Sequence, residues 1–527
     1  MKKPFVAVIC HYFLIVTCAV LCWPALSSGA AVSGQDLVLF YTSDNHGETE
    51  PCGCEANQLG GLGRRSFQFQ RIAVESGQPR LVVDAGDLLF KHLAIPAGLE
   101  MQESMMAEAI VEAYSLVGYD AVCVGSRDLI AGVGLLRKVA PQGKFTWLSA
   151  NLVDKSTGGP IFAATVRRQI GEVKATLIGL TGPATLAPAD NAELLSWEKV
   201  LPPLLTEASK TTDLVILLSN LPAAENRRIA EAYDSIHILI QSASGDGGAI
   251  SASPVHNTVI ASTRPQGKDI GVMNITWQSS KRWGCPPAEV LAQKKSVLDG
   301  VIWQLSKYQT GTQDPESTLS DQPDRLKAYR VLVSRERELR DEIQELILCD
   351  PAAESPEGNP STYRNRFFTL DSSLPDQRDV VEVSDRLDRA LNQLGRELAK
   401  TQVEVDSNYL GSARCTSCHA EQAAAWQKTP HASAYVTLVN KDQQFNVNCL
   451  PCHVTGVGMD RASEALSIAE VRRGVGCETC HGAGRKHTQD PMGNSMIRKP
   501  EASVCLSCHA PPHDESFDYE RNIKMVH

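Results

Sequence analysis

The sequence predicts a multidomain protein with an α/β region, a helical connector and a cysteine-rich C-terminal region. Three observations carry this prediction: the length of the chain, its apolar pattern and the spacing of its cysteines. At 527 residues the chain exceeds one ordinary core and suggests about three domains. The apolar fraction of 43% and the charged fraction of 21% exclude a mostly disordered or collagen-like chain. The net charge of -10 argues against a general nucleic-acid binder.

Residues 1–30 have the pattern of a secretory signal peptide. Lys2 and Lys3 precede an apolar stretch over residues 5–23, and small residues follow near Ala30. This arrangement predicts export and cleavage, and the alternative is a retained anchor because the stretch is nearly long enough to span a bilayer. After cleavage we expect no membrane span and a periplasmic or other extracytoplasmic location, where disulfides can persist.

Residues 36–280 are predicted to form an α/β domain, because short apolar strands alternate with helices. Met101–Gly118 has the pattern of one of the helices. The expected strands are Leu37–Tyr41, Leu81–Asp84, Ala121–Val124, Thr176–Leu180, Leu214–Leu218 and Ile236–Ile240. Polar residues follow three of these strands, at the sheet edge where sites form in open sheets. They are Ser43–Gly47, Asp84–Asp87 and Gly125–Asp128.

This order of motifs resembles the calcineurin-like metallophosphoesterases, and within them the 5′-nucleotidase branch. Gly60-Gly61-Leu62-Gly63-Arg64-Arg65 and Tyr119-Asp120-Ala121 fit that branch as well. The resemblance implies an α/β sandwich with a two-metal centre that activates water and clamps a phosphate. It places Asp44, His46 and Asp87 at metal-ligand positions.

Other positions depart from the pattern of that family. The expected Gly-Asn-His-Glu/Asp is Gly125-Ser126-Arg127-Asp128, so a bridging Asn ligand and the catalytic His are missing. The strand expected to end in Ser-His ends in Ser219-Asn220, and the expected Gly-His-x-His lies near residues 241–245 with neither His. We therefore expect a degenerate, inactive domain that keeps one weakly bound divalent ion. The alternative is that Asp44 and His46 are only polar residues that cap a loop.

The sixteen cysteines divide into three in the signal peptide, eight in a repeated motif and five elsewhere. The five are Cys52, Cys54, Cys123, Cys285 and Cys349. Because five is odd, at least one is unpaired or bonded outside the chain. For Pro51-Cys52-Gly53-Cys54 we expect a structural disulfide with Cys123, with Cys285 or within the pair, and the alternative is that the motif binds a soft metal or accepts electrons. The pairing stays open.

The eight cysteines of the repeated motif form four copies of C-x-x-C-H in the C-terminal region, residues 408–527. The copies are Cys415-Thr-Ser-Cys418-His419, Cys449-Leu-Pro-Cys452-His453, Cys477-Glu-Thr-Cys480-His481 and Cys505-Leu-Ser-Cys508-His509. This is the attachment signature of c-type haem, in which two thiols bind the vinyl groups and the histidine binds the iron from the proximal side. A zinc ribbon would not require the trailing histidines. We predict four covalent haem c groups.

The same region has four further histidines, one candidate distal ligand for each haem. They are His431, His487, His513 and His527. The competing ligands are Met459, Met492, Met496 and Met525. Two histidines on one iron leave no open position and imply electron transfer, whereas an open iron would admit a small substrate. Four porphyrins in so short a chain leave little room for an ordinary core, so we expect the macrocycles to form it with their edges close together.

The C-terminal region resembles the cytochrome c554 family of tetrahaem proteins. The resemblance rests on Tyr409-Leu-Gly411-Ser412 before the first motif, Trp426-Gln-Lys-Thr429-Pro-His431 after it, Gly476 and Gly482 around the third, and the Phe517-Asp518-Tyr519 tail. It implies a mostly α-helical fold with closely stacked haems that shuttles electrons in anaerobic or nitrogen-oxide respiration. The sequence has no C-x-x-C-Lys variant, which argues against a catalytic haem of the nitrite-reductase type.

Residues 286–400 have the composition of a helical connector. Two sets of apolar residues repeat at near-heptad steps. They are Leu332, Leu339, Ile343 and Leu346, and then Leu387, Leu391, Leu394 and Leu398. We predict a helical hairpin, a short extended stretch near Phe367–Leu370, and a helix that leads into the haem region. Packing on the neighbouring domain is the main interpretation, and dimerisation through these helices is the alternative.

Together these patterns predict an exported multihaem cytochrome with a phosphoesterase-like platform domain. We expect its partners to be redox proteins, such as other cytochromes or a respiratory complex. One alternative is a periplasmic nucleotidase or other phosphoester hydrolase with an attached haem module. Another is a haem oxidoreductase that acts on a small nitrogen or sulfur compound, which requires one open iron. Whether the protein is an enzyme stays open on the sequence.

Overall fold

The structure is a computed structural model, and it describes most of the chain after residue 33. The described ranges are residues 34–52, 58–242, 251–284, 288–309, 315–319, 322–348, 359–401, 408–493, 496–509 and 517–526. Several predictions therefore lie outside the described residues, namely those on the signal peptide, Cys54, Cys285, Cys349, His513 and His527. In the described part of the chain, no helix is long and apolar enough to cross a membrane.

The N-terminal half contains two six-stranded sheets that face each other. The first has the strand order β16-β15-β1-β4-β5-β6. Its strands are β1 (Gln35–Thr42), β4 (Arg80–Asp84), β5 (Ala121–Cys123), β6 (Thr146–Leu148), β15 (Asp269–Trp277) and β16 (Thr362–Thr369). The second has the order β13-β14-β12-β11-β9-β8. Its strands are β8 (Thr165–Ile170), β9 (Val173–Leu180), β11 (Leu214–Ser219), β12 (Ile238–Gln241), β13 (Ser251–Val255) and β14 (Thr258–Ser262). Short pairs add β2 (Pro51–Cys52) with β3 (Leu59–Gly60), and β7 (Leu152–Asp154) with β10 (Ala192–Leu194).

An apolar layer lies between the two sheets. Alternate residues of β1 and β4, such as Leu39 and Val83, meet residues of β11 and β12, such as Ile216 and Ile240, in one buried cluster. The central strands β1, β4, β5 and β6 run parallel, as do β9, β11, β12 and β14. Parallel strands with both faces covered are rich in consecutive apolar residues, as the six predicted strands are. All six form, with boundaries shifted by no more than a few residues.

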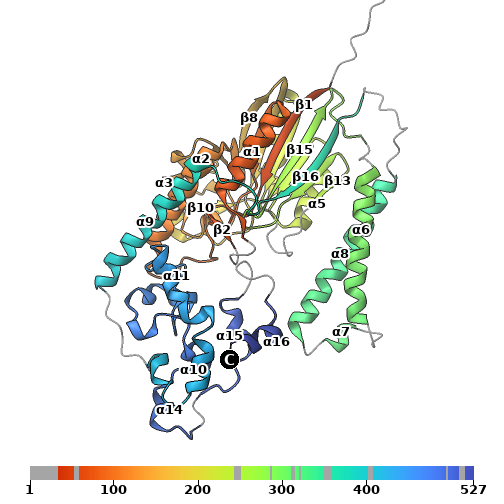
Figure 1. The fold of residues 1–527 in the computed structure, drawn as a ribbon. Coiled ribbons are helices and arrows are strands. Elements are labelled where there is room, and N and C mark those ends of the chain that lie inside the picture. Colours follow the sequence, from red (N-terminus) through yellow and green to blue (C-terminus); the bar gives the residue numbers. More distant parts are fainter. Residues whose placement is uncertain are drawn as a thin grey trace, which may run out of the picture. The chain divides into compact units, whose positions relative to one another are not determined.

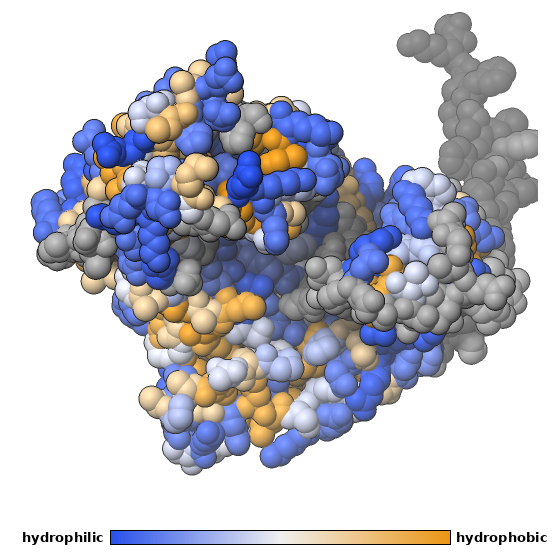
Figure 2. Space-filling model, turned by 90° about the horizontal axis from the view of Figure 1, so that it is seen from below, coloured by the Kyte–Doolittle hydropathy of each residue, from blue (hydrophilic) through white to orange (hydrophobic). Residues whose placement is uncertain are grey.

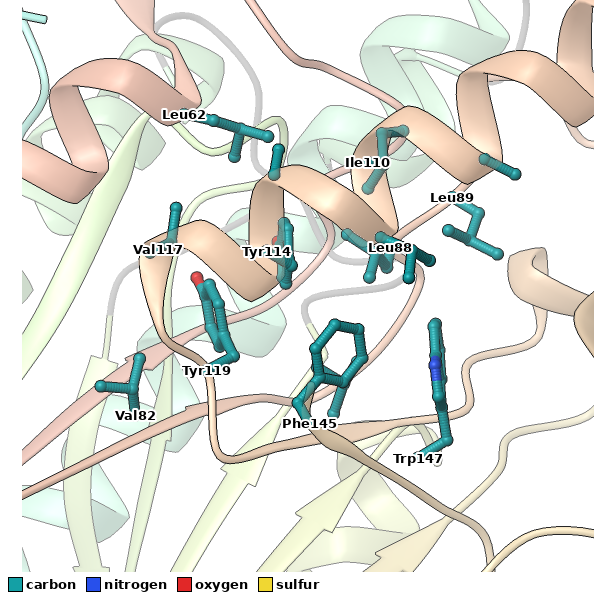
Figure 3. Close-up of a cluster of buried hydrophobic side chains, with 14 of the residues drawn as sticks. Leu62, Val82, Leu88, Leu89, Ile110, Tyr114, Val117, Tyr119, Phe145 and Trp147 are labelled. Atoms are coloured by element: carbon teal, nitrogen blue, oxygen red, sulfur yellow. The ribbon is translucent and has the colours of Figure 1, made fainter. Parts of the chain in front are cut away.

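Helices cover the outer faces of the sheets (Figure 1). On the first sheet lie α1 (Leu62–Ser76), α2 (Glu100–Val117), α3 (Val133–Val139) and α9 (Arg378–Thr401). Their apolar residues share a second cluster with β1 and β4. In this cluster the ring of Tyr114 stacks on that of Tyr119, and Phe145 and Trp147 lie near Leu88 with tilted rings (Figure 3). On the second sheet lie α4 (Trp197–Thr211) and α5 (Ala223–Ala232), which bury a third cluster. The result is an α/β sandwich of four layers.

The connector contributes to this sandwich. The predicted extended stretch is the strand β16, and it pairs antiparallel with β15 along its whole length. The helix α9 contacts α1 and α2, and Val380 and Val383 are buried against them. The predicted hairpin is formed by α6 (Ala288–Gln309) and α8 (Pro323–Leu348), which lie side by side (Figure 1). The short helix α7 (Pro315–Thr318) lies between them in the sequence. A strand from the connector thus completes the first sheet.

The C-terminal region consists of short helices and irregular segments. The α-helices are α10 (Ala420–Trp426), α11 (Ala434–Asn440), α12 (Leu450–His453), α13 (Cys477–His481), α14 (Arg485–Gln489), α15 (Ala502–Leu506) and α16 (Tyr519–Asn522). Large hydrophobic side chains stay exposed here, for example Val436, Val471, Met492 and Leu506. Figure 2 shows hydrophobic residues among hydrophilic ones on one face of the protein. The expectation of no ordinary core needs correction around the second C-x-x-C-H motif, where residues 438–468 bury a small apolar cluster.

Candidate metal centre and haem sites

The three predicted metal ligands of the α/β region come together at one edge of the first sheet. Asp44 and His46 follow β1, and Asp87 follows β4, which pairs in parallel with β1. One ligand atom from each residue lies within 4.8 Å of the others, and both carboxylates are 1% exposed. Nε2 of His46 is 3.6 Å from Oδ1 of Asp44. The fold therefore gathers two carboxylates and one imidazole at a single point.

The backbone holds these three residues in an unusual conformation. Asp44, His46 and Asp87 all have positive φ, at 54°, 51° and 56°. Residues other than glycine rarely take this left-handed conformation, and it costs free energy that the surrounding fold must supply. The two loops hold each other in place, because the amide of Asp44 donates to the carbonyl of Gly86 and the amide of His46 donates to that of Asp87. Such strain concentrates at functional sites.

A third loop supports Asp87 from behind. Its Oδ1 accepts a hydrogen bond of 2.8 Å from the amide of Arg127, and a Cβ on Gly125 would collide with Asp87. The buried carboxylate of Asp128 accepts from the amides of Leu88, Leu89 and Gly125. Burial and then the nearby Asp87 carboxylate raise the pKa of Asp128 well above its ordinary value. Asp128 thus fixes the loop geometry.

The positions where the sequence lacks the expected ligands also lie at this site. Ser242 donates a hydrogen bond of 2.5 Å to Oδ1 of Asp44, and Ser126 donates one of 3.4 Å to Oδ1 of Asp87. Oδ1 of Asn220 accepts from the amide of Ser126. Its Nδ2 is buried without a hydrogen-bond partner in the described part of the chain. Ser126 therefore stands where the family pattern has a bridging Asn, and Asn220 stands where it has a His.

The donor set fits one hard divalent cation. Two buried carboxylates this close together are costly unless a cation or a proton compensates their charge. Among the described residues, Nε2 of His46 has no hydrogen-bond partner although it is buried, so it is available as a ligand. Oxygen ligands with one imidazole suit a cation such as Mn²⁺. Asp44, His46 and Asp87 would hold the ion, and bound there it would act as a Lewis acid.

A buried polar network lies behind the centre. Arg65, which is 1% exposed, donates to the hydroxyls of Tyr114 and Tyr119 and to Oδ1 of Asn45. Asp84 accepts from Tyr114, and burial raises its pKa above the ordinary value. The sequence analysis noted the motif that contains Arg65 but missed that Arg65 is buried and joins this network. In the sequence, only the position of Arg65 on the buried face of its helix indicates this.

Cys123 is a free cysteine. Its thiol is buried at the end of β5 and donates to the carbonyl of Leu180 at 3.4 Å. Burial raises the pKa of this thiol well above the ordinary value, so it is unreactive as a nucleophile. The expected disulfide from Cys52 or Cys54 to Cys123 is therefore wrong, because Cys123 is free and packs between the two sheets.

In the C-terminal region, cysteines of different C-x-x-C-H motifs lie next to each other. The thiol of Cys415 in the first motif hydrogen-bonds with that of Cys477 in the third. The thiol of Cys452 in the second motif does so with that of Cys508 in the fourth. The attachment points therefore adjoin in two pairs, first with third and second with fourth.

Two of the predicted distal histidines face histidines of the motifs. The ring centres of His419 and His487 are 6.2 Å apart, with 28° between the ring planes. Those of His431 and His509 are 5.9 Å apart, with 66° between the planes. Rings at such distances do not stack in contact. Two imidazoles bound end-on to one metal, with bonds of about 2 Å each, have ring centres about 6 Å apart. Both pairs fit an iron between them.

Hydrogen bonds orient the other two motif histidines. Nδ1 of His453 donates to the carbonyl of Ala434, and Nδ1 of His481 donates to that of Ile497, each at 2.6 Å. Because a carbonyl oxygen can only accept, each Nδ1 carries the proton and Nε2 keeps its lone pair for a metal. Nδ1 of His487 is buried without a hydrogen-bond partner among the described residues. These histidines fit haem ligation.

A buried carboxylate joins the first and third motifs. Glu478, inside the third motif, is 2% exposed and accepts hydrogen bonds from the amides of Leu410, Gly411 and Gly484. Three backbone donors stabilise the charged carboxylate and tie together segments that are far apart in sequence. These are the segments on which the predicted family resemblance rests.

Comparison with known proteins separates the chain into two parts. Residues 414–482 match the family model described as cytochrome c554 and c-prime. Cytochrome c-554 of Nitrosomonas europaea is 34% identical over 137 residues, which is 23% of this chain and 58% of that protein. The Protein UshA of Escherichia coli is 26% identical over 207 residues, which is 36% of this chain and 34% of that protein.

One solved structure also aligns with part of this chain. The 5′-nucleotidase precursor of Thermus thermophilus aligns with a TM-score of 0.46 at 15% identity, covering 71% of this chain and 61% of that one. The chain spans just over half the length of the cytochrome and about a third of that of UshA. This protein is multidomain, and it joins an α/β region similar to 5′-nucleotidases to a C-terminal region similar to the cytochrome c554 family.

Proposed function

We propose that the protein is an exported c-type cytochrome with four haems that transfers electrons between redox proteins. Haem would be attached at the eight cysteines of the C-x-x-C-H motifs, with His419, His453, His481 and His509 as proximal ligands. The similarity to cytochrome c554 supports haem c and electron transfer. The signal-like N-terminus supports export out of the cytoplasm.

The observation that carries the proposal is that two of the candidate distal histidines each stand opposite a histidine of a C-x-x-C-H motif. His487 stands opposite His419, and His431 stands opposite His509, each at the separation that one iron would span. An iron with two histidine ligands has no open position, so it exchanges electrons rather than binding substrate. The adjoining cysteines of motifs one and three, and of two and four, support haems close enough for transfer between them.

The test is the haem content and ligation of the purified mature protein. Four haems per chain by the pyridine haemochrome assay, with low-spin signals in electron paramagnetic resonance, are expected. His487→Met should change the electron paramagnetic resonance signal of one low-spin haem. Met492→Ala, at an exposed residue of the same region, should leave all signals unchanged. Fewer than four haems, or His487→Met without spectral effect, would contradict the assignment.

For the α/β region we propose a platform that binds one divalent cation and lacks nucleotidase activity. The cluster of Asp44, His46 and Asp87 supports one ion, while Ser126 and Asn220 replace the Asn and His ligands that the family pattern has for two ions. The proposed domains are residues 36–280 for this platform, 286–400 for the connector and 408–527 for the haem module, with β16 adding to the first sheet.

The second candidate function is hydrolysis of a phosphoester, which the same ligand cluster favours. It predicts Mn²⁺-dependent turnover of nucleoside monophosphates that Asp87→Ala abolishes and Glu75→Ala, at an exposed residue of α1, leaves unchanged. No turnover with any divalent cation would remove this candidate. Equilibrium binding of Mn²⁺ with a stoichiometry near one would support the platform, and a stoichiometry of two would contradict it.

A further inference from the structure

The segment that leaves the candidate metal centre reaches the second C-x-x-C-H motif. It runs from Leu88 to Leu99, between Asp87 and the start of α2. Leu99 is 1% exposed, and it belongs to the same buried apolar cluster as Val447, Leu450 and Val454, which flank Cys449 and His453. A residue of the α/β region thus belongs to the apolar cluster around this motif.

Polar contacts join the same two parts. Asn448, which directly precedes Cys449, donates to the Sδ atom of Met106 in α2 at 3.3 Å. The side chain of His92 hydrogen-bonds with Asn448 as well. Ser463 donates to the carbonyl of Ala97 at 3.4 Å. The contact therefore consists of both buried apolar and specific polar interactions.

Lys91 places a positive charge on this segment. Nζ of Lys91 lies 3.3 Å from Oε1 of Glu48, and the guanidinium of Arg127 donates to the carbonyl of Lys91 at 2.8 Å. Burial and then Lys91 lower the pKa of His92, and Arg127 lowers it further. Burial raises the pKa of Glu103 to about 7, so this neighbour of Lys91 is only partly charged near neutral pH.

Lys91 directly precedes His92, whose side chain hydrogen-bonds with Asn448, the residue before Cys449. Burial raises the pKa of Cys449 to about 12, Asp388 raises it and Lys91 opposes the rise. The hydrogen bond with Cys508 and burial raise the pKa of Cys452, and Lys91 opposes that rise too. Glu50, Asp388 and Lys441 act on Cys449, so charges of both signs face this thiol. Lys91 is the charged side chain of the α/β region that acts on both.

We propose that the haem attached at Cys449 and Cys452 is shared by both regions, and that Lys91 of the α/β region raises its reduction potential. This rests on the proposed function, because it requires haem at the second motif. Reduction lowers the charge of the haem iron by one, so a nearby cation favours the reduced form over the oxidised form. A half-buried ammonium is screened less by salt than one on the surface.

The experiment is a potentiometric titration of the full mature holoprotein, followed by the absorbance of the haems. Lys91→Met removes the charge and keeps the length of the side chain, Lys91→Arg keeps the charge, and Lys138→Met is the control. Lys138 is an exposed lysine of the same region that pairs with Glu108 at 2.8 Å. We expect Lys91→Met to shift one haem to a more negative potential and leave the others in place. Lys91→Arg should stay near the wild type.

The same samples separate failure of the inference from failure of the proposed function. Haem content is measured on each, and a wild-type protein without haem at Cys449 and Cys452 would overturn both. If haem is present and Lys91→Met titrates like Lys138→Met, only the inference is overturned. The inference also fails if all haems shift equally or if Lys91→Arg behaves like Lys91→Met. In a Cys449→Ala, Cys452→Ala background, the effect of Lys91→Met should vanish.

Discussion

The α/β region and the C-terminal region obtain their order in different ways. Three large clusters of buried side chains hold the two sheets and their helices, and residues such as Leu39 and Ile216 are fully buried. In the C-terminal region the helices have four to seven residues, shorter than an isolated helix needs to be stable. The cysteines of its four motifs are half-buried or exposed. The first region is held by its own side chains, and the second is built to enclose cofactors.

This contrast predicts that loss of haem disrupts one region and spares the other. In protein produced without haem attachment, the parts of residues 408–526 outside the cluster at residues 438–468 should be cut rapidly by a protease, because few apolar side chains described there are buried. The α/β region should survive as a resistant fragment, since its core contains no cofactor. Limited proteolysis with mass spectrometry measures this. Equal resistance of both regions to the protease, or cleavage of both, would contradict the idea that only the C-terminal region depends on haem for its order.

The second prediction acts on the α/β core. Leu39→Ala removes a fully buried side chain between the sheets and should destabilise this region by about 2–5 kcal/mol. The haem spectrum should remain that of the wild type. Val74→Ala, at a residue of α1 that is 84% exposed, is the matched control and should change little. Chemical denaturation followed separately by tryptophan fluorescence and haem absorbance distinguishes the two regions.

The same contrast explains how far the sequence could predict the structure. Strands with long apolar runs, such as Leu214–Leu218, bury both faces and are recognisable from their pattern. The ligands Asp44 and Asp87 follow such strands, so their convergence could also be foreseen. The contact of Leu99 with Val447 could not, because nothing in the local pattern links residues so far apart in sequence. The strand β16 was predicted only as a short extended stretch, since its partner β15 is distant in the chain.

A third prediction concerns pH and α2, the helix at the border of the two regions. The pKa of Glu103 is raised by burial to about 7 in the folded state, above its ordinary value of 4.5. A raised pKa means that its contribution to stability is complete below about pH 4.5 and is lost as the pH rises towards 7. Glu103→Gln, which cannot ionise, should therefore have a free energy of unfolding about 1–3 kcal/mol higher than the wild type at pH 8. At pH 4.5 the two proteins should be equal.

The control for that prediction is Glu108→Gln, which changes a partly exposed carboxylate of the same helix that pairs with Lys138. Because a surface ion pair contributes little to stability, its unfolding should stay close to that of the wild type at pH 4.5 and at pH 8. A Glu103→Gln protein with unchanged pH dependence would mean that the carboxylate of Glu103 reaches solvent. The border between the regions would then be looser than the burial of Gln102 and Glu103 indicates.

The smallest expected effect tests whether the two regions communicate. Asp87 precedes Lys91 by four residues, and its loop is fixed by Arg127, which also contacts the carbonyl of Lys91. A divalent cation bound at Asp44, His46 and Asp87 adds positive charge near the same haem and should raise its potential slightly. At constant ionic strength, Mn²⁺ should raise the reduction potential of one haem in the wild type and of none in Asp87→Asn. The control variant Glu108→Gln should respond to Mn²⁺ as the wild type does. If Asp87→Asn responds like the wild type, the cation acts elsewhere and the two regions are independent electrostatically.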